Sequence, residues 1–469
     1  MRDLTQRSAL ELSEQIEKGE LTSVQVTSAF LDRIEQYNPK INAIVSLRSR
    51  TDILADAKIA DETPRRGWLH GMPLAVKDLA ETKGVRTTFG SPLFADHIPT
   101  QDCLMVKRIR DAGAIIIGKT NTPEFGLGSH TFNPVHGATC NPYAPALSAG
   151  GSSGGAAAAL AARLVPIADG SDMMGSLRNP AAFCNVYGFR PSWGLVPDEP
   201  VGDMYLQQLA TSGPMGRSPA DIAALLNTLA GPDARSPNAV QLVPDIGDLS
   251  GSVKGKRIGW FGDWGGAYPC ENGILNLCQT GLSVFERLGC VIEPVKAPFD
   301  AADLWSSWLT LRAWAIACRM RETYDDPEKR ALLKPAMIWE IEQGISLSAH
   351  DVHCASEIRS EWFRKFAEIS AEYDAFALPS AQVWPFPINW TYPEIINGAR
   401  MDTYHRWMEI VVPVSLIGLP CLAIPAGFGA QGLPMGLQLF GCRGSDHQIL
   451  KLGQAYHTHQ DWTAQSPDL

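Results

Sequence analysis

The chain is organised around two segments, Gly150-Gly-Ser-Ser-Gly-Gly155 and Gly170-Ser-Asp-Met-Met-Gly-Ser-Leu-Arg178. The alanine-rich run at 156–164 follows the first segment directly and predicts a helix. The apolar run at 165–168 stands before the second segment and is typical of a strand. A glycine- and serine-rich turn, a helix and a strand therefore lead into a second turn, which carries Ser176.

Short apolar runs typical of strands alternate with helical patterns along the rest of the chain. The strand-like runs lie at residues 72–76, 114–117, 165–168, 257–261, 375–379, 421–425 and 435–440. Helical spacing of apolar residues predicts helices near 7–18, 22–37 and 445–458. This alternation predicts an α/β fold in which helices cover both faces of a large sheet.

The chain shows no internal repeat and no low-complexity linker, so we expect residues 1–469 to form a single domain. The region from about 300 to 372 differs in being rich in helix formers and tryptophan. We expect it to be a mainly helical insertion near the substrate.

Composition excludes several classes of function. Hydrophobic residues make up 45% of the chain and charged residues 19%, the balance of a soluble globular enzyme. A net charge of −10 argues against nucleic-acid binding. The longest charge-free stretch, 410–442, is interrupted by four prolines, which argues against a membrane span. The first residues lack the apolar core of a signal peptide, so we expect a cytoplasmic protein.

Cysteine and histidine spacing gives no sign of a metal or disulfide framework. None of the ten cysteines forms a CxxC pair, which predicts free thiols. His350 and His353 form one HxxH without a glutamate between them, and a surface pair is the favoured interpretation. We therefore expect no metal and no cofactor.

Two local patterns suggest other functions but lack the required context. Residues 113–120 satisfy GxxxxGK[ST], yet the variable positions are Ala-Ile-Ile-Ile, which favours a buried strand over a phosphate-binding loop. Residues 150–155 contain GxSxG, the nucleophile turn of α/β-hydrolases. That turn should follow a strand, whereas residues 141–149 are predicted to be irregular.

Both patterns belong to a larger set of segments that occur in a characteristic order. Gly71-Met-Pro-Leu-Ala-Val-Lys77-Asp78, the 150–155 turn and the segment from Gly170 to Phe183 together resemble the amidase-signature family. Further segments agree with that family in the same order: 118–126, 137–142, 188–194, 418–425 and 432–438. The resemblance covers nearly the whole chain and is weakest between about 200 and 400. It implies a large mixed β-sheet covered by helices on both faces.

The resemblance implies a Ser–Ser–Lys arrangement in which Ser176 is the nucleophile, Ser152 relays the proton and Lys77 is the base. In the family, the relay serine follows a cis peptide bond. A free lysine with a pKa near 10.4 is protonated at neutral pH, so Lys77 must be buried to act as a base. The apolar residues before Lys77 are consistent with a buried strand end.

The resemblance also implies an oxyanion hole made of the backbone amides of Met173, Met174, Gly175 and Ser176. The family commonly has two glycines before the nucleophile, whereas this chain has Met174-Gly175. Asp172 and Arg178 flank the nucleophile and are expected to support its loop. Ser153 is expected to act as a helix cap or as part of the hydrogen-bond network.

The resulting expectation is an amidase that hydrolyses aryl or aliphatic carboxamides through a serine acyl-enzyme, with esters and carbamates open as further substrates. Its only expected ligand is a small-molecule amide, and it would act as a monomer or homodimer. The alternative is an amidotransferase A-type subunit that delivers ammonia to a partner. Five tryptophans are candidates for an apolar pocket or for the core: Trp305, Trp308, Trp314, Trp384 and Trp390.

Overall fold

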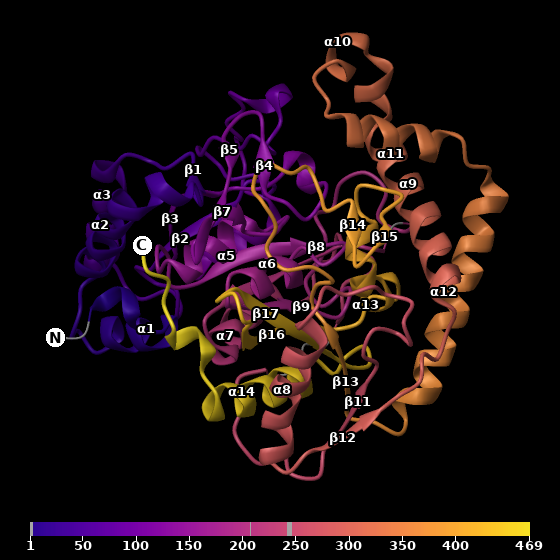
Figure 1. Ribbon diagram of the computed structural model, residues 1–469. Coiled ribbons are helices and arrows are strands. Elements are labelled where there is room, and N and C mark those ends of the chain that lie inside the picture. The colour runs from indigo at the N-terminus through magenta and orange to yellow at the C-terminus, as the bar shows by residue number, and fades with distance from the viewer. Residues whose placement is uncertain (1–2, 207, 242–245) are drawn as a thin grey trace.

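The computed structural model describes residues 3–206, 208–241 and 246–469 (Figure 1). Its main sheet has eight strands in the order β12-β11-β13-β17-β16-β9-β10-β8. The pairs of β11 with β12 and β13 are parallel and the other pairs are antiparallel, so the sheet is mixed, as expected. The bounds are β8 (Ala168–Asp172), β9 (Tyr187–Arg190), β10 (Thr211–Gly216), β11 (Arg257–Trp260), β12 (Val291–Pro294), β13 (Ala375–Pro379), β16 (Cys421–Phe428) and β17 (Pro434–Phe440).

A smaller sheet carries Lys77 and has the order β1-β3-β2, with β1 (Ile44–Val45), β2 (Pro73–Lys77) and β3 (Ile115–Thr120). The GxxxxGK[ST] pattern therefore runs into strand β3, as its apolar residues predicted. Lys119 is buried in that strand and its ammonium lies 2.8 Å from Thr82 Oγ1, so it holds a neighbouring loop.

Three short hairpins complete the strands: β4 (Phe132–Asn133) with β5 (Gly137–Ala138), β6 (Cys140–Asn141) with β7 (Ala144–Ser148), and β14 (Ile395–Ile396) with β15 (Ala399–Arg400). The prediction of an irregular segment at 141–149 was wrong, because β6 and β7 pair there. The prolines at 142 and 145 argued against a strand in the sequence. The two short strands form because the chain reverses direction and β6 pairs with β7, which no local pattern indicates. The strand predicted at 165–168 begins only at Ala168.

Helices cover both faces of the main sheet. A Cβ at Gly436 in β17 would meet Ala182 of α6, whereas Leu437, the next residue, contacts Gly281 of α8. Successive residues of a strand point to opposite faces, so α6 and α8 lie on opposite sides. The helices are α1 (Ala9–Glu17), α2 (Ser23–Ile41), α3 (Arg50–Glu62), α4 (Leu104–Asp111), α5 (Gly154–Ala161), α6 (Arg178–Phe183), α7 (Pro219–Leu229), α8 (Ile274–Arg287), α9 (Ala301–Asp325), α10 (Pro327–Arg330), α11 (Pro335–Ile345), α12 (Ala349–Ser370), α13 (Val412–Leu416) and α14 (Asp446–His459).

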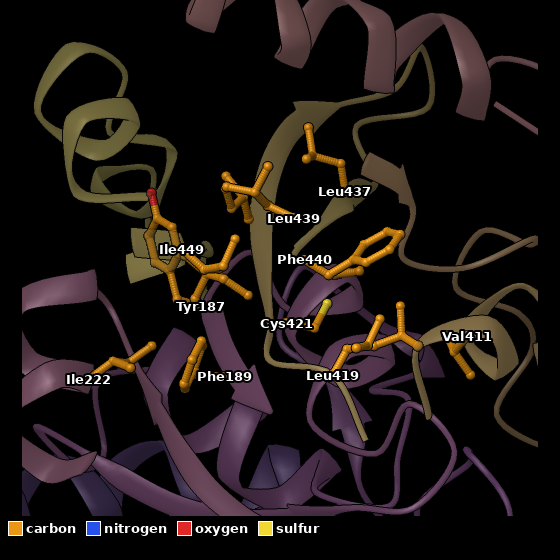
Figure 2. Close-up of a cluster of buried hydrophobic side chains, with 14 of the residues drawn as sticks. Tyr187, Phe189, Ile222, Val411, Leu419, Cys421, Leu437, Leu439, Phe440 and Ile449 are labelled. Carbon is orange, nitrogen blue, oxygen red and sulfur yellow. The ribbon is translucent and has the colours of Figure 1, made fainter. Parts of the chain in front are cut away.

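The core lies where β9, β16 and β17 meet α14 and α7. Figure 2 shows Tyr187 and Phe189 of β9 among side chains that include Ile222 of α7 and Ile449 of α14. These residues are at most 1% exposed. Burying apolar area at roughly 25 cal/mol per Å² makes this region a main source of stability for the strands that hold the site.

Residues 301–370 form α9 to α12, which lie along one side of the molecule in Figure 1. α9 packs against both α11 and α12. His350 and His353 are exposed on α12, as the surface interpretation predicted, and all ten cysteines are free thiols. Within the described ranges, no helix combines the length and the apolar character that crossing a membrane requires.

Candidate active site

Lys77 lies at the end of β2 with 1% of its surface exposed. Its Nζ is 2.8 Å from Ser152 Oγ, 2.9 Å from Ser153 Oγ and 3.1 Å from Ser171 Oγ. We call these four residues the lysine–serine cluster. Ser171 carries no signal of its own in the sequence, although it lies inside the 170–178 segment; its contact with Lys77 depends on how β8 and β2 pack.

Burial lowers the pKa of Lys77 from 10.5 to about 7, because the ammonium loses its hydration. Asp169 and Asp172 oppose this shift, but neither comes within ion-pair distance of Nζ in the described structure. Asp169 is bound instead to the backbone of Lys77, whose N–H lies 3.0 Å from Asp169 Oδ1. A large fraction of Lys77 is therefore neutral near pH 7 and able to accept a proton.

The 150–155 turn presents its two serines to Lys77. The Gly151–Ser152 peptide bond is cis, as the family resemblance implied. Ser129 Oγ donates to the Gly151 carbonyl and fixes this turn. Ser153 stands at the N-cap position of α5, yet its side chain makes no capping hydrogen bond. Its hydroxyl is directed to Lys77, so of its two expected roles the geometry favours the network.

The turn that carries Ser176 is braced by a buried ion pair. Arg178 binds Asp172 through two contacts of 3.0 Å, and Arg190 adds a third at 3.3 Å. Burial alone would raise the pKa of Asp172, but the two guanidiniums hold it well below its usual range. Asp172 also accepts hydrogen bonds from the amides of Gly175, at 2.9 Å, and Leu177, at 3.1 Å. The Asp172 carboxylate therefore fixes the turn on both sides of Ser176.

The backbone N–H groups of residues 173–176 differ in whether they already donate a hydrogen bond. The Gly175 N–H is already occupied by Asp172, whereas those of Met173, Met174 and Ser176 donate to no acceptor among the residues that the structure describes. Gly175 has φ +78°, and a Cβ there would lie 2.2 Å from Asn179 Oδ1, so only glycine fits. Met174 is 3% exposed; it packs in the core and also lines the cavity over Ser176.

A cavity of about 380 Å³ opens over Ser176 and also reaches Ser152 and Ser171. The Ser176 hydroxyl makes no hydrogen bond to any described side chain, so it is available to a ligand. The other lining residues are mainly apolar: Leu79, Phe89, Phe94, Phe125, Gly126, Leu127, Gly128, Met173, Met174, Ala210, Arg312, Ile316, Arg319, Met320, Thr323, Met337 and Met408.

Three phenylalanines form the aromatic part of the cavity. Phe94 meets Phe89 and Phe125 edge to face, with ring centroids 5.1 and 6.1 Å apart. Phe89 and Phe125 have φ of +52° and +49°, unusual for bulky residues and characteristic of functional sites. Phe125 lies in the 118–126 segment of the family pattern, but nothing in the sequence indicated its place in the cavity.

The tryptophans do not line this cavity within the described ranges. Trp305 and Trp308 are buried in the core on α9. Trp384 lines a different cavity together with Asn272, whose carbonyl lies 3.1 Å from the Trp384 indole N–H. The core interpretation was therefore the better one for Trp305 and Trp308, and the pocket interpretation was wrong. The α9 residues that do line the cavity are Arg312, Ile316, Arg319, Met320 and Thr323.

The chain thus combines a mixed α/β fold with a candidate active site, in which a buried lysine and serine hydroxyls lie beneath an apolar cavity. This combination is that of an enzyme. Residues 25–450 match the family model described as Amidase, and the chain belongs to this family of amide-hydrolysing enzymes.

The relatives agree over nearly the whole chain. The chain is 31% identical to an acylamidase of Rhodococcus erythropolis, over 98% of this chain and 97% of that protein. It is 33% identical to the A-type subunit of glutamyl-tRNA(Gln) amidotransferase from Chloroflexus aurantiacus, over 96% of each. The crystal structure of a bacterial aryl acylamidase superposes with a TM-score of 0.90 at 28% identity, covering 97% of this chain and 96% of that one.

Proposed function

We propose that this amidase hydrolyses apolar carboxamides through an acyl-enzyme on Ser176, with Ser152 as the proton relay and Lys77 as the base. The observation that carries the proposal is the 2.8 Å contact between Lys77 Nζ and Ser152 Oγ on the buried side of the cavity that Ser176 lines. A lysine whose pKa is about 7 accepts a proton near neutral pH and can return it in the next step.

In the acylation step, Ser176 Oγ attacks the amide carbonyl carbon while its proton passes to Ser152 and a proton of Ser152 passes to Lys77. The carbonyl oxygen becomes an oxyanion, which the free amides of Met173, Met174 and Ser176 would stabilise. The Gly175 amide is omitted from this set because Asp172 already accepts its hydrogen bond.

Collapse of the tetrahedral intermediate breaks the C–N bond, and the proton held by Lys77 returns through Ser152 to the leaving nitrogen. The amine departs, leaving an ester on Ser176. Water then attacks this ester and gives a proton through Ser152 to Lys77. The C–Oγ bond breaks, the proton returns through Ser152 to Ser176 Oγ, and the carboxylic acid is released. Asp172 and Arg178 touch no substrate in this scheme; they hold the turn in position.

The cavity favours an apolar acyl or aryl group. Its phenylalanines and methionines bury such a group, and the hydrophobic contribution is about 1.5–3 kcal/mol for a side chain of that size. The names of two relatives, acylamidase and aryl acylamidase, agree with this substrate class. The same acyl-enzyme chemistry extends to esters and carbamates of similar shape.

An amidotransferase role is the second candidate because a relative bears that name. Glutamine carries an ammonium, which needs an acidic or carbonyl-rich partner when it binds. Among the described residues that line the cavity there is no aspartate or glutamate. The lining therefore favours apolar amides over glutamine.

The test is turnover by the purified chain alone against anilides, aliphatic amides, esters, carbamates and glutamine. We expect anilide and apolar amide hydrolysis without a partner, and its loss in Ser176→Ala. Release of ammonia from glutamine only, or no amide turnover at all, would refute the proposal.

A further inference from the structure

One face of α9 runs along the cavity. Residues 312, 316, 319, 320 and 323 line it, a spacing of four, seven, eight and eleven residues that places them on one side of a helix. Two of these residues are arginines, and they stand in different electrostatic surroundings.

Arg312 is a structural cation whose charge is neutralised. It is 4% exposed and its Nε lies 3.1 Å from Glu340 Oε1. Its other nitrogens donate to the Tyr404 hydroxyl at 2.8 Å and to Met173 Sδ at 3.3 Å. These contacts fix Met173 beside the Ser176 turn and leave Arg312 little capacity for a ligand.

Arg319 lacks such partners. It is exposed, and it makes no ion pair and no side-chain hydrogen bond with any residue of the described ranges. Arg321, two residues on and outside the cavity, is by contrast paired with Asp325 at 2.7 Å. Burial raises the pKa of Asp198 to about 6, and Arg319 is close enough to oppose this shift, although the two form no ion pair.

We infer that Arg319 binds an anionic group at the far end of the substrate, so that the preferred substrates are apolar amides that carry a carboxylate distant from the scissile bond. This inference rests on the proposed function of the cavity. No acidic side chain lines the cavity among the residues that the structure describes. The Arg319 guanidinium can therefore attract a carboxylate and offer it two parallel N–H donors.

Helical geometry sets the shape of such a substrate. Arg319 follows Arg312 by two helical turns, about 10 Å along the axis at 1.5 Å per residue. Ile316 lies between them and Met320 beside them, so the path from Arg312 to Arg319 is apolar. The ligand therefore needs an apolar chain or ring between the amide and the charged end.

The experiment compares matched substrates on the full-length enzyme. Hexananilide is paired with adipanilic acid, which places a carboxylate on the acyl side. Hexananilide is also paired with 4-(hexanoylamino)benzoic acid, which places the carboxylate on the leaving-group side. Each pair is assayed with wild type, Arg319→Gln, Arg319→Lys and the control Arg321→Gln, which removes an arginine of the same helix outside the cavity.

For the carboxylated member of at least one pair, we expect Arg319→Gln to lower kcat/KM about five- to tenfold, mainly through KM, because a partly solvated ion pair is modest in strength. Arg319→Lys keeps the positive charge but loses the two parallel donors, so its kcat/KM for the carboxylated substrate should fall between the values for wild type and Arg319→Gln. Neutral substrates, and all substrates with Arg321→Gln, should change less than twofold.

An equal loss on neutral and carboxylated substrates, or no loss on either carboxylated substrate, would overturn the inference. If wild type does not hydrolyse hexananilide, the proposed function itself fails, and the two failures are thereby distinguished.

Discussion

The lysine–serine cluster and the wall of the cavity above it are built in different ways. In the cluster, Lys77 Nζ has three serine hydroxyls within 3.1 Å, and Asp172 holds the adjoining turn through a buried ion pair. The wall is made of phenylalanine, methionine and α9 side chains that touch through apolar contacts. Hydrogen-bond geometry tolerates little change, whereas apolar packing tolerates volume-conserving exchange. The reaction should therefore depend on the cluster and the choice of substrate on the wall.

The largest effect should come from Ser176→Ala, which removes the proposed nucleophile. We expect kcat to fall by at least about 10⁴-fold on every substrate, since loss of a nucleophile removes the covalent route altogether. The Tm should change little, because the hydroxyl makes no hydrogen bond to a described side chain. Steady-state kinetics measures kcat, and thermal unfolding measures the Tm. Residual activity within tenfold of wild type would mean that Ser176 is not the nucleophile.

Lys77→Met should lower kcat by about 10³-fold or more, again on every substrate, because the proton has no acceptor. It should also change stability in a pH-dependent way. The folded pKa of about 7 lies below the ordinary 10.5, so a protonated, buried Lys77 destabilises the fold below pH 7. This cost declines as pH rises from about 7 to 10.5.

The stability difference between Lys77→Met and wild type should therefore favour the variant more at pH 6 than at pH 9. Denaturant unfolding at the two pH values measures it, and Lys58→Met, at an exposed lysine of α3, is the control. If the difference in the free energy of unfolding is the same at both pH values, the surroundings of Lys77 do not disfavour its charged form.

These two regions also differ in what the sequence could predict. The alternation of strand-like and helical segments was enough to predict the α/β fold. Lys77, Ser152 and Ser176 were predicted as site residues because several segments resemble the amidase-signature family in the same order, whereas no single segment would have indicated them. The occupation of the Gly175 amide by Asp172 and the place of Ser171 depend on packing between β2 and β8. The wall unites residues from 79 to 408, and no periodicity distinguishes Phe89 or Met337 from core residues.

A smaller and selective effect is expected at the wall. Phe125→Ala should lower kcat/KM for anilides about 10- to 50-fold, because it removes an apolar surface that binds the aryl group. Small amides such as acetamide should change less than about threefold. Trp308→Phe, in the core of α9 and outside the cavity, is the comparison variant. Equal losses on large and small amides would assign Phe125 to the reaction and not to selection.

The smallest catalytic effect should come from Met174→Gly, which restores two adjacent glycines before Ser176. The backbone amide is unchanged, so kcat should stay within about fivefold. The side chain is 3% exposed, and its loss should cost about 2–4 kcal/mol in the free energy of unfolding. A large fall in kcat with unchanged stability would place Met174 in the reaction and weaken the division between cluster and wall.

The most direct test of the cluster is the rate at which phenylmethylsulfonyl fluoride modifies the enzyme between pH 5.5 and 9, with the labelled peptide identified by mass spectrometry. Wild type should be labelled on Ser176. The labelling rate should rise with pH as Lys77 loses its proton, with a midpoint near pH 7 and a plateau at higher pH. Lys77→Met should react slowly and without that midpoint. Labelling at another residue, or the same pH dependence in Lys77→Met, would contradict the assignment of Lys77 as the base.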